Sequence, residues 1–211
     1  MVELIIGLLI LICVALVAIA ILFFRSIVSA AKDGDGRAPT VGDLNKLKGQ
    51  AGEAEVTRIL LRLPPEDYEL FTTVILPKDA ERSRVEMDHV VLSQFGIFVV
   101  ETKRWGGEVH GGVDGEWSQQ IGRQFHWHRN PYAQNERQVR RLRQHLDVAP
   151  SAIRGIVCFV GDTMLGGDVP DNVVRAGGLL DYIGRFRSEQ LNPEGLAAYR
   201  ARLTELTRSD R

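Results

Sequence analysis

Three charged side chains, those of Asp88, Glu101 and Lys103, lie inside two apolar runs where a strand usually carries none. The runs flank a short turn at residues 93–96, and this pattern predicts a β-hairpin. Glu101 and Lys103 are two positions apart, so their side chains leave a strand on the same face. If the turn has an even number of residues, the hairpin places Asp88 opposite Glu101, with the side chains roughly 5 Å apart.

Two carboxylates at that distance repel each other, and burying them costs free energy unless a positive charge compensates. A divalent cation beside the Lys103 ammonium would supply that charge, and such a cluster indicates metal-dependent hydrolysis of a phosphodiester. A three-residue turn with Gly96 as a bulge would instead place Asp88 and Glu101 on opposite faces. An edge hairpin whose charges simply face water, with Lys103 as a surface or salt-bridge residue, is the plainer alternative.

A third acid, Glu53, lies on the first predicted helix of the soluble part. It stands three residues before Val56 and seven before Leu60, so it borders the apolar stripe and faces the sheet. Gly49 and Gly52 on the same side would let the helix approach the sheet backbone closely. Glu53 is therefore a candidate for metal binding or water positioning, and the alternative is a helix-edge acid paired with an arginine.

The pair Asn130-Pro131 predicts the start of another helix, with Asn as the N-cap and Pro at the first helical position. Gln134 lies in the first turn, where free N–H groups and the helix dipole favour a phosphate or a carboxylate–metal cluster. Arginines occupy the other faces of this helix and could follow a nucleic-acid backbone or simply be solvated; they are Arg137, Arg140, Arg141 and Arg143.

The stretch just before this helix is rich in histidines and aromatic residues. His126 and His128 have no third His or Cys at a useful spacing, which argues against a structural zinc site. Phe125 and Trp127 could stack on nucleic-acid bases, although aromatic residues more often belong to a core, so we leave both out of the candidate site. Cys158 lies in an apolar run and is expected to be an inert core residue.

The order of the elements predicts an α/β (α+β) fold with an α-β-β-β-α-β core, in which a mixed sheet lies between helices. In chain order we expect a helix over 46–63, strands over 68–76, 85–93 and 97–103, a small hairpin within 106–122, a helix over 130–146, a strand over 153–160, a short strand over 173–176 and a helix over 193–207.

The apolar run Leu4–Phe24 is long enough to span a hydrocarbon core of about 30 Å. Basic residues follow it and Glu3 precedes it, so the positive-inside rule predicts that the rest of the chain faces the cytoplasm. A cleaved signal peptide ending at residues 28–30 is the alternative, but the run is long for one. We therefore expect a transmembrane anchor over 1–31, a linker over 32–45 and one domain over 46–211.

The net charge of the 211 residues is −1, so bulk charge does not indicate a nucleic-acid partner. The motifs are more specific. Together they resemble the NERD (nuclease-related) domain of the PD-(D/E)xK nuclease superfamily over residues 49–160; they are Gly49-x-x-Gly52-Glu53, Met87-Asp88-His89, Gly96 to Lys103, Trp105-Gly106-Gly107, Trp117 and Asn130 to Asn135. Two positions depart from the family pattern: Met87 replaces the superfamily's proline, and Arg104 stands where the family would have Asn.

The resemblance implies a restriction-endonuclease-like fold and a site that uses Mg²⁺ or Mn²⁺. Asp88 and Glu101 would bind the metal, with the Thr102 carbonyl as a third ligand by family analogy. Lys103 would hold the attacking water or stabilise charge in the transition state. Glu53 and Gln134 would complete the catalytic set. Independently of the resemblance, Arg137, Arg140 and Arg141 are candidates for contacting the nucleic acid.

These observations predict a nuclease that is anchored in the inner membrane through residues 4–24 and hydrolyses DNA on the cytoplasmic side. Two alternatives stay open. The same fold could be a non-catalytic, membrane-tethered module that binds nucleic acid or acts as a scaffold. A metal-free interaction domain, whose Glu-x-Lys is fortuitous, would show no effect of divalent ions on its stability.

Overall fold

The computed structural model describes residues 40–77 and 84–208. Its residues from Asn45 onward form one compact unit. The predicted membrane span and most of the predicted linker lie outside the described ranges. No helix within those ranges is both long and apolar enough to cross a membrane.

The main sheet is mixed, as the sequence predicted. Its antiparallel part consists of β1 (Tyr68–Leu76), β2 (Val85–Ser93) and β3 (Gly96–Lys103). Two further strands run parallel to β3; they are β7 (Ile153–Phe159) and β9 (Val173–Arg175). The strand order is β1-β2-β3-β7-β9. The predicted bounds of β1 and β2 are confirmed, and those of the other three strands are within one residue. The central strands therefore follow from their near-continuous apolar runs, which are typical of strands buried on both faces.

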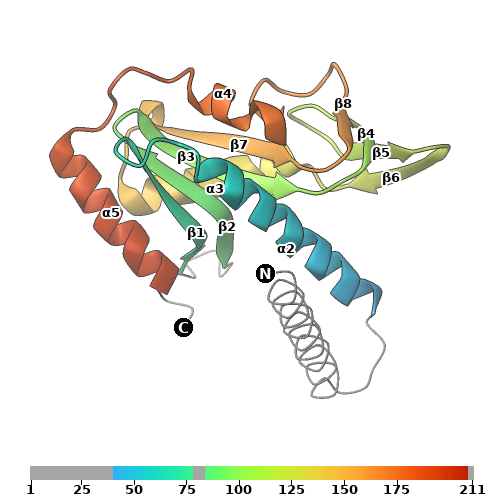
Figure 1. The fold of residues 1–211 in the computed structure, drawn as a ribbon, viewed down its shortest axis with the longest axis horizontal. Helices are drawn as coiled ribbons and strands as arrows, with labels where there is room; N and C mark the ends of the chain where they lie inside the picture. The colour runs from blue at the N-terminus through green and yellow to red at the C-terminus, as the bar shows by residue number, and fades with distance from the viewer. Residues whose placement is uncertain (1–39, 78–83, 209–211) are drawn as a thin grey trace, which may run out of the picture. The chain divides into compact units, whose positions relative to one another are not determined.

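Helices cover both faces of this sheet (Figure 1). On one face, α2 (Val41–Leu60) and α4 (Leu179–Ile183) contribute buried apolar residues to a common cluster with β2, β3 and β7. On the other face, α3 (Pro131–Leu146) and α5 (Pro193–Arg208) pack against β1, β2 and β3. The strand residues between them lose contact with water, and this burial supplies the main stabilisation of the unit.

A second, smaller sheet follows β3 and extends from one end of the main sheet (Figure 1). Its order is β6 (Gln124–His128), β5 (Trp117–Ile121), β4 (Gly107–His110) and β8 (Thr163–Leu165). The predicted small hairpin corresponds to β4 and β5. Strands β6 and β8 were not predicted, because β6 buries almost none of its side chains and β8 is three residues long. Neither has an apolar run to reveal it.

The first helix begins earlier than expected. It starts at Val41 instead of residue 46, so residues 41–45 are helical where the sequence analysis expected the end of a linker. Thr40 and Asp43 explain the start: the Thr40 backbone amide donates to Asp43 Oδ2 at 2.8 Å, and the Asp43 amide donates to Thr40 Oγ1 at 3.2 Å. This is a reciprocal capping arrangement, and the Thr-x-x-Asp spacing could have been read from the sequence.

Candidate active site

Strands β2 and β3 separate from each other at Asp88. A two-residue turn pairs Ser93 with Gly96, and the ladder runs back to the pair His89–Val100, so the even register predicted from the sequence is confirmed. One step further the register would pair Asp88 with Glu101. There the Thr102 backbone amide donates to Asp88 Oδ2 at 2.7 Å, so the side chain replaces the next ladder bond.

The side-chain alternation of β2 also changes at this point. Val85 and Met87 pack in the same apolar cluster as Val90 and Leu92, although strict alternation would put the two pairs on opposite faces. Thr73, the β1 residue opposite Asp88, has a φ of 55°. The backbone is therefore irregular on both strands where the carboxylate of Asp88 turns toward the main chain of β3.

Glu101 is the most enclosed acid of the cluster, with 3% of its surface exposed. Its Oε1 accepts from Lys103 Nζ at 2.5 Å and from Gln134 Nε2 at 2.7 Å. Its Oε2 accepts from Gln138 Nε2 at 2.6 Å. Glu101 and Lys103 therefore share one face, as predicted, and charge-assisted hydrogen bonds hold this buried carboxylate.

The first turns of α3 supply the amides that hold Glu101. Asn130 caps the helix by accepting from the Ala133 amide at 3.0 Å, and Pro131 occupies the first helical position, as predicted. Gln134 also accepts from Lys103 Nζ at 3.1 Å, so it joins the ammonium to the carboxylate. The predicted residues Glu101, Lys103 and Gln134 therefore lie together in the structure.

Gln138 is a site residue that the sequence analysis missed. Its side chain is buried, with 2% of the residue exposed, and its Nε2 donates to the Glu86 carbonyl at 2.9 Å as well as to Glu101. The signal was available, because Gln138 lies four residues after Gln134 and thus on the same helix face. Asn135 donates to Gln138 Oε1 at 3.2 Å and so orients that amide toward Glu101.

Asn135 connects α3 to the sheet. It is 1% exposed, and its Nδ2 donates to the Val99 carbonyl at 3.1 Å. A Cβ at Gly155 would lie 2.1 Å from Asn135 Oδ1, so only glycine fits there. The glycine of β7 thus leaves room for the side chain that fixes the helix above the site.

Glu53 approaches the cluster from α2, on the other face of the sheet. Partial burial raises its pKa, and the negative charges of Glu86 and Glu101 raise it further, while Lys103 lowers it. Gly52 makes this approach possible, since a Cβ there would lie 3.2 Å from Val160 and 3.5 Å from Thr102. The same role expected for Gly49 is wrong, because nothing lies within 4 Å of the place its Cβ would take.

A buried histidine lies beside Asp88 on β2. His89 is 1% exposed, and its Nε2 is 2.8 Å from Thr57 Oγ1, which donates to the Glu53 carbonyl at 2.9 Å. Because the hydroxyl has one proton to give, the arrangement makes His89 Nε2 the donor and leaves Nδ1 unprotonated. Burial lowers the pKa of His89 to about 4, so the ring is neutral near pH 7. It links β2 to the helix that carries Glu53.

Asp88 has an unusually high pKa for a carboxylic acid. Burial is the largest cause, and the charge of Glu101 adds to it, so the pKa rises to about 7 even though the Thr102 amide and Lys103 oppose the change. Three carboxylates, those of Glu53, Asp88 and Glu101, therefore influence one another around a single ammonium. The cluster carries an excess of negative charge that a cation would relieve.

The stability difference between Asp88→Asn and the wild type is expected to depend on pH. The folded wild type holds the Asp88 proton up to about pH 7, whereas the unfolded chain loses it near pH 3.8. The contribution of Asp88 to the unfolding free energy therefore falls as the pH rises between those two values. We expect the two proteins to be closest in stability near about pH 4, and the variant to be more stable by roughly 2–4 kcal/mol at about pH 8. Urea unfolding in EDTA measures this, and the titration of His89 cancels because both proteins contain it. A difference that does not change with pH would contradict the raised pKa.

The arginines of α3 do not form one surface. Arg137 and Arg140 are exposed, whereas Arg141 is buried with 6% of its surface exposed. Arg141 therefore does not fit the nucleic-acid contact that the sequence analysis expected of it. Burial follows from helical spacing, since Arg141 is three residues after Gln138 and one before Leu142 on the side that faces the sheet.

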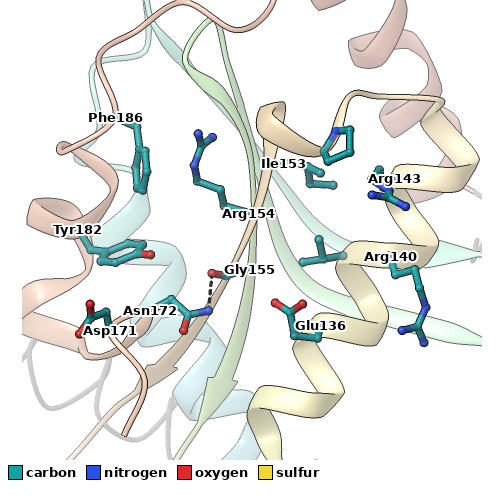
Figure 2. A pocket seen from close by; sticks show the side chains of 12 residues that line it. Glu136, Arg140, Arg143, Ile153, Arg154, Gly155, Asp171, Asn172, Tyr182 and Phe186 are labelled. Atoms are coloured by element: carbon teal, nitrogen blue, oxygen red, sulfur yellow. Dashed lines mark hydrogen bonds between the residues drawn. The ribbon is translucent and has the colours of Figure 1, made fainter. Parts of the chain in front are cut away.

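A groove of about 670 Å³ lies beside α3, at the edge of β7 (Figure 2). Glu136 and Arg140 line it from α3, and Tyr182 and Phe186 line it from the opposite side. Asn172 donates to the carbonyl of Gly155 in β7 at 3.1 Å. None of the predicted catalytic residues lines this groove. This groove is thus separate from the carboxylate cluster.

Comparisons with known proteins find a matching family and a curated relative. A family model described as "Nuclease-related domain" (NERD) matches residues 48–160, which include β1 to β7 and α3. An uncharacterized protein from Bacillus anthracis is 34% identical over 98 residues, which make up 46% of this chain and 46% of that protein. The chain thus spans about half the length of this curated relative. No solved structure matches the chain.

Proposed function

Because this chain belongs to the nuclease-related domain (NERD) family, we propose that its carboxylate cluster hydrolyses phosphodiester bonds in DNA with a bound Mg²⁺ or Mn²⁺ ion. The observation that carries the proposal is the meeting of Asp88 and Glu101 where β2 and β3 separate, next to Lys103 and Gln134. Family membership supports a nuclease-related function, and this geometry supports the particular residues.

The donor set suits a hard cation. Asp88 uses one oxygen for the Thr102 amide, which leaves Oδ1 for a metal, and Glu101 retains a lone pair on Oε2 beside the Gln138 bond. Within the described ranges no three His, Cys, Asp or Glu side chains meet as a metal site. Two carboxylates, the Thr102 carbonyl and water are therefore the set we propose, and Mg²⁺ commonly keeps several waters in this way.

A bound divalent ion would acidify the attacking water and polarise the phosphate. Lys103 is well placed to act on that water or on the phosphate, since its side chain is 19% exposed and its ammonium is held by Glu101 and Gln134. Preorganised charge of this kind favours a transition state that gains negative charge. Glu53 would orient water from the α2 side, where its raised pKa makes it a better proton acceptor.

The direct test is a cleavage assay with the purified full-length chain. Plasmid, single-stranded DNA and RNA would each be incubated with Mg²⁺, Mn²⁺ or EDTA. Cutting that needs a divalent ion and disappears in EDTA is the expected result, and the substrates separate DNA from RNA hydrolysis. A folded protein that binds nucleic acid but cuts none of the substrates would contradict the proposal.

A divalent ion is also expected to stabilise the fold. A ligand that binds only the folded state raises the unfolding free energy, by about 2.7 kcal/mol at a concentration 100 times its Kd. We expect Mg²⁺ to raise the Tm of the wild type and to have almost no effect on Asp88→Asn. Thermal unfolding with Mg²⁺, and with KCl at matched ionic strength, measures this. Equal shifts in both proteins would place the ion elsewhere.

One observation favours a second candidate, a non-catalytic nucleic-acid-binding module on the same fold. Glu101 already accepts hydrogen bonds from Lys103, Gln134 and Gln138, so this carboxylate is compensated without a metal. In that case Mg²⁺ would leave the Tm unchanged and no cleavage would occur, while Arg137 and Arg140 would still contribute to nucleic-acid affinity.

We propose further that the apolar run at residues 4–24 anchors the chain in the inner membrane and that the nuclease-related domain faces the cytoplasm. The basic residues after the run support this orientation. Fractionation followed by protease treatment of spheroplasts tests it. Protection of the domain until the membrane is opened is expected, and digestion in intact spheroplasts would reverse the proposed orientation.

A further inference from the structure

Strand β6 presents two aromatic rings to solvent. Phe125 is 58% exposed and Trp127 is 67% exposed, although aromatic side chains of this size are usually covered. They are two positions apart on one strand, so both rings project from the same face of the second sheet. The core role that the sequence analysis favoured for them is thus wrong.

The nearest cross-strand neighbours of the two rings on this sheet face are polar. Ser118 is the partner of Trp127 and Gln120 is the partner of Phe125, and the next strand continues the two rows with His110 and Glu108. On the opposite face Val109 and Trp117 are buried and pack against Phe159. The rings therefore stand on the outer face of the sheet, with polar neighbours instead of a continuous apolar patch.

Positive charge flanks the two rings. Arg123 and Arg129 are exposed at the two ends of β6, and they alternate with Phe125 and Trp127 along the chain. An Arg-x-Phe-x-Trp-x-Arg strand offers cations to a phosphate backbone and ring faces to bases. This combination is the one by which proteins bind single-stranded nucleic acid without reading its sequence.

The aromatic strand is connected to the candidate active site. Trp105 follows Lys103 by two residues, and His128 of β6 stacks on its ring with centroids 4.0 Å apart. Burial lowers the pKa of His128, and the charges of His126 and Lys103 lower it further. His128 also donates to Gln119 Oε1 at 2.9 Å, which fixes the end of β6 to β5.

We propose that Phe125 and Trp127 form a stacking surface for the bases of a single-stranded nucleic acid that continues into the Asp88–Glu101 site. This inference rests on the proposed function, because it names the form of nucleic acid that the same site receives. Two bases would stack on the rings while Arg123 and Arg129 bind the flanking phosphates. Duplex bases are paired and stacked on each other, so they cannot use these rings.

The test measures binding of a fluorescent oligothymidine and of a short duplex to the full-length chain, in EDTA so that nothing is cut. Trp127→Leu and Phe125→Leu are each expected to weaken oligothymidine binding roughly tenfold and to leave duplex binding nearly unchanged. Trp127→Phe should restore the affinity, and Met164→Ala is the matched control because Met164 is exposed at 57% on the same sheet face. Oligothymidine should quench the tryptophan fluorescence of the wild type and not that of Trp127→Phe.

Cleavage by the same proteins with Mg²⁺ separates this inference from the proposed function. If the wild type cuts DNA but the leucine variants bind oligothymidine as tightly as it does, the stacking surface is wrong and the nuclease stands. If no protein cuts, yet affinity depends on the rings, the surface stands and catalysis fails. Three results would overturn the inference. The first is that the wild type does not bind oligothymidine, and the second is that the leucine variants lose duplex binding to the same extent. The third is a change of oligomeric state in the leucine variants, which would identify the rings as a protein interface.

Discussion

Replacing Asp88 with asparagine is expected to reduce metal-dependent cleavage by about a thousandfold or more, an effect as large as the loss of a principal electrostatic group in other enzymes. Asparagine keeps an oxygen that can accept from the Thr102 amide at the end of the β2–β3 ladder, so the strand geometry should persist. It removes the charge that would bind the ion, and with it the repulsion between residue 88 and Glu101. The measurement is the cleavage rate under single-turnover conditions, with Mg²⁺ and with Mn²⁺.

The result can be interpreted because the variant should fold at least as well as the wild type in EDTA. Asp147→Asn makes the same chemical change at an exposed position beyond the far end of α3 and should cut at the wild-type rate. If Asp88→Asn retained full activity while binding Mg²⁺ normally, the reaction would have to take place elsewhere on the chain. An inactive variant that is also unfolded would be uninformative, so circular dichroism accompanies each assay.

Local signals explain which parts of the site could be predicted from the sequence. The meeting of Asp88 and Glu101 depends on the parity of one short turn, and the start of α3 depends on one Asn-Pro pair. Both are set by residues that are neighbours in the chain. The pKa of Asp88, in contrast, depends on burial under helices that come from distant parts of the sequence, so its value could not be predicted.

The second sheet shows where the sequence analysis was insufficient. Strand β6 has no buried side that would produce an apolar alternation, and its pairing with β5 is what makes it a strand. The exposure of Phe125 and Trp127 followed from the structure alone, since their residue types indicate a core as readily as a binding surface. Gln138 was different, because its spacing from Gln134 was visible and its burial was not.

Gln138 is expected to be the amide on which the geometry of Glu101 depends most. Its side chain donates at 2.6 Å to the carboxylate and at 2.9 Å to the Glu86 carbonyl. Water cannot easily replace the bond to the carboxylate, because Gln138 is 2% exposed and Glu101 is 3% exposed. Gln138→Ala should therefore lower the unfolding free energy by about 2–4 kcal/mol, because a buried charged acceptor loses one of its three donors. Urea unfolding measures this loss, and Gln144→Ala, at an exposed position of the same helix, should change it by less than about 0.5 kcal/mol.

Gln138→Met separates the hydrogen bonds from the packing, because it keeps most of the side-chain volume and removes both donors. If the donors hold Glu101 in place, this variant should be nearly as unstable as Gln138→Ala, and its cleavage rate should fall roughly 10- to 100-fold, as for other groups that orient a metal ligand. If Gln138→Met were as stable and as active as the wild type, Lys103 and Gln134 would suffice to position the carboxylate. The Glu101 carboxylate would then be held by Lys103 and Gln134 alone, and α3 would contribute to the site mainly through its first turn, which carries Gln134.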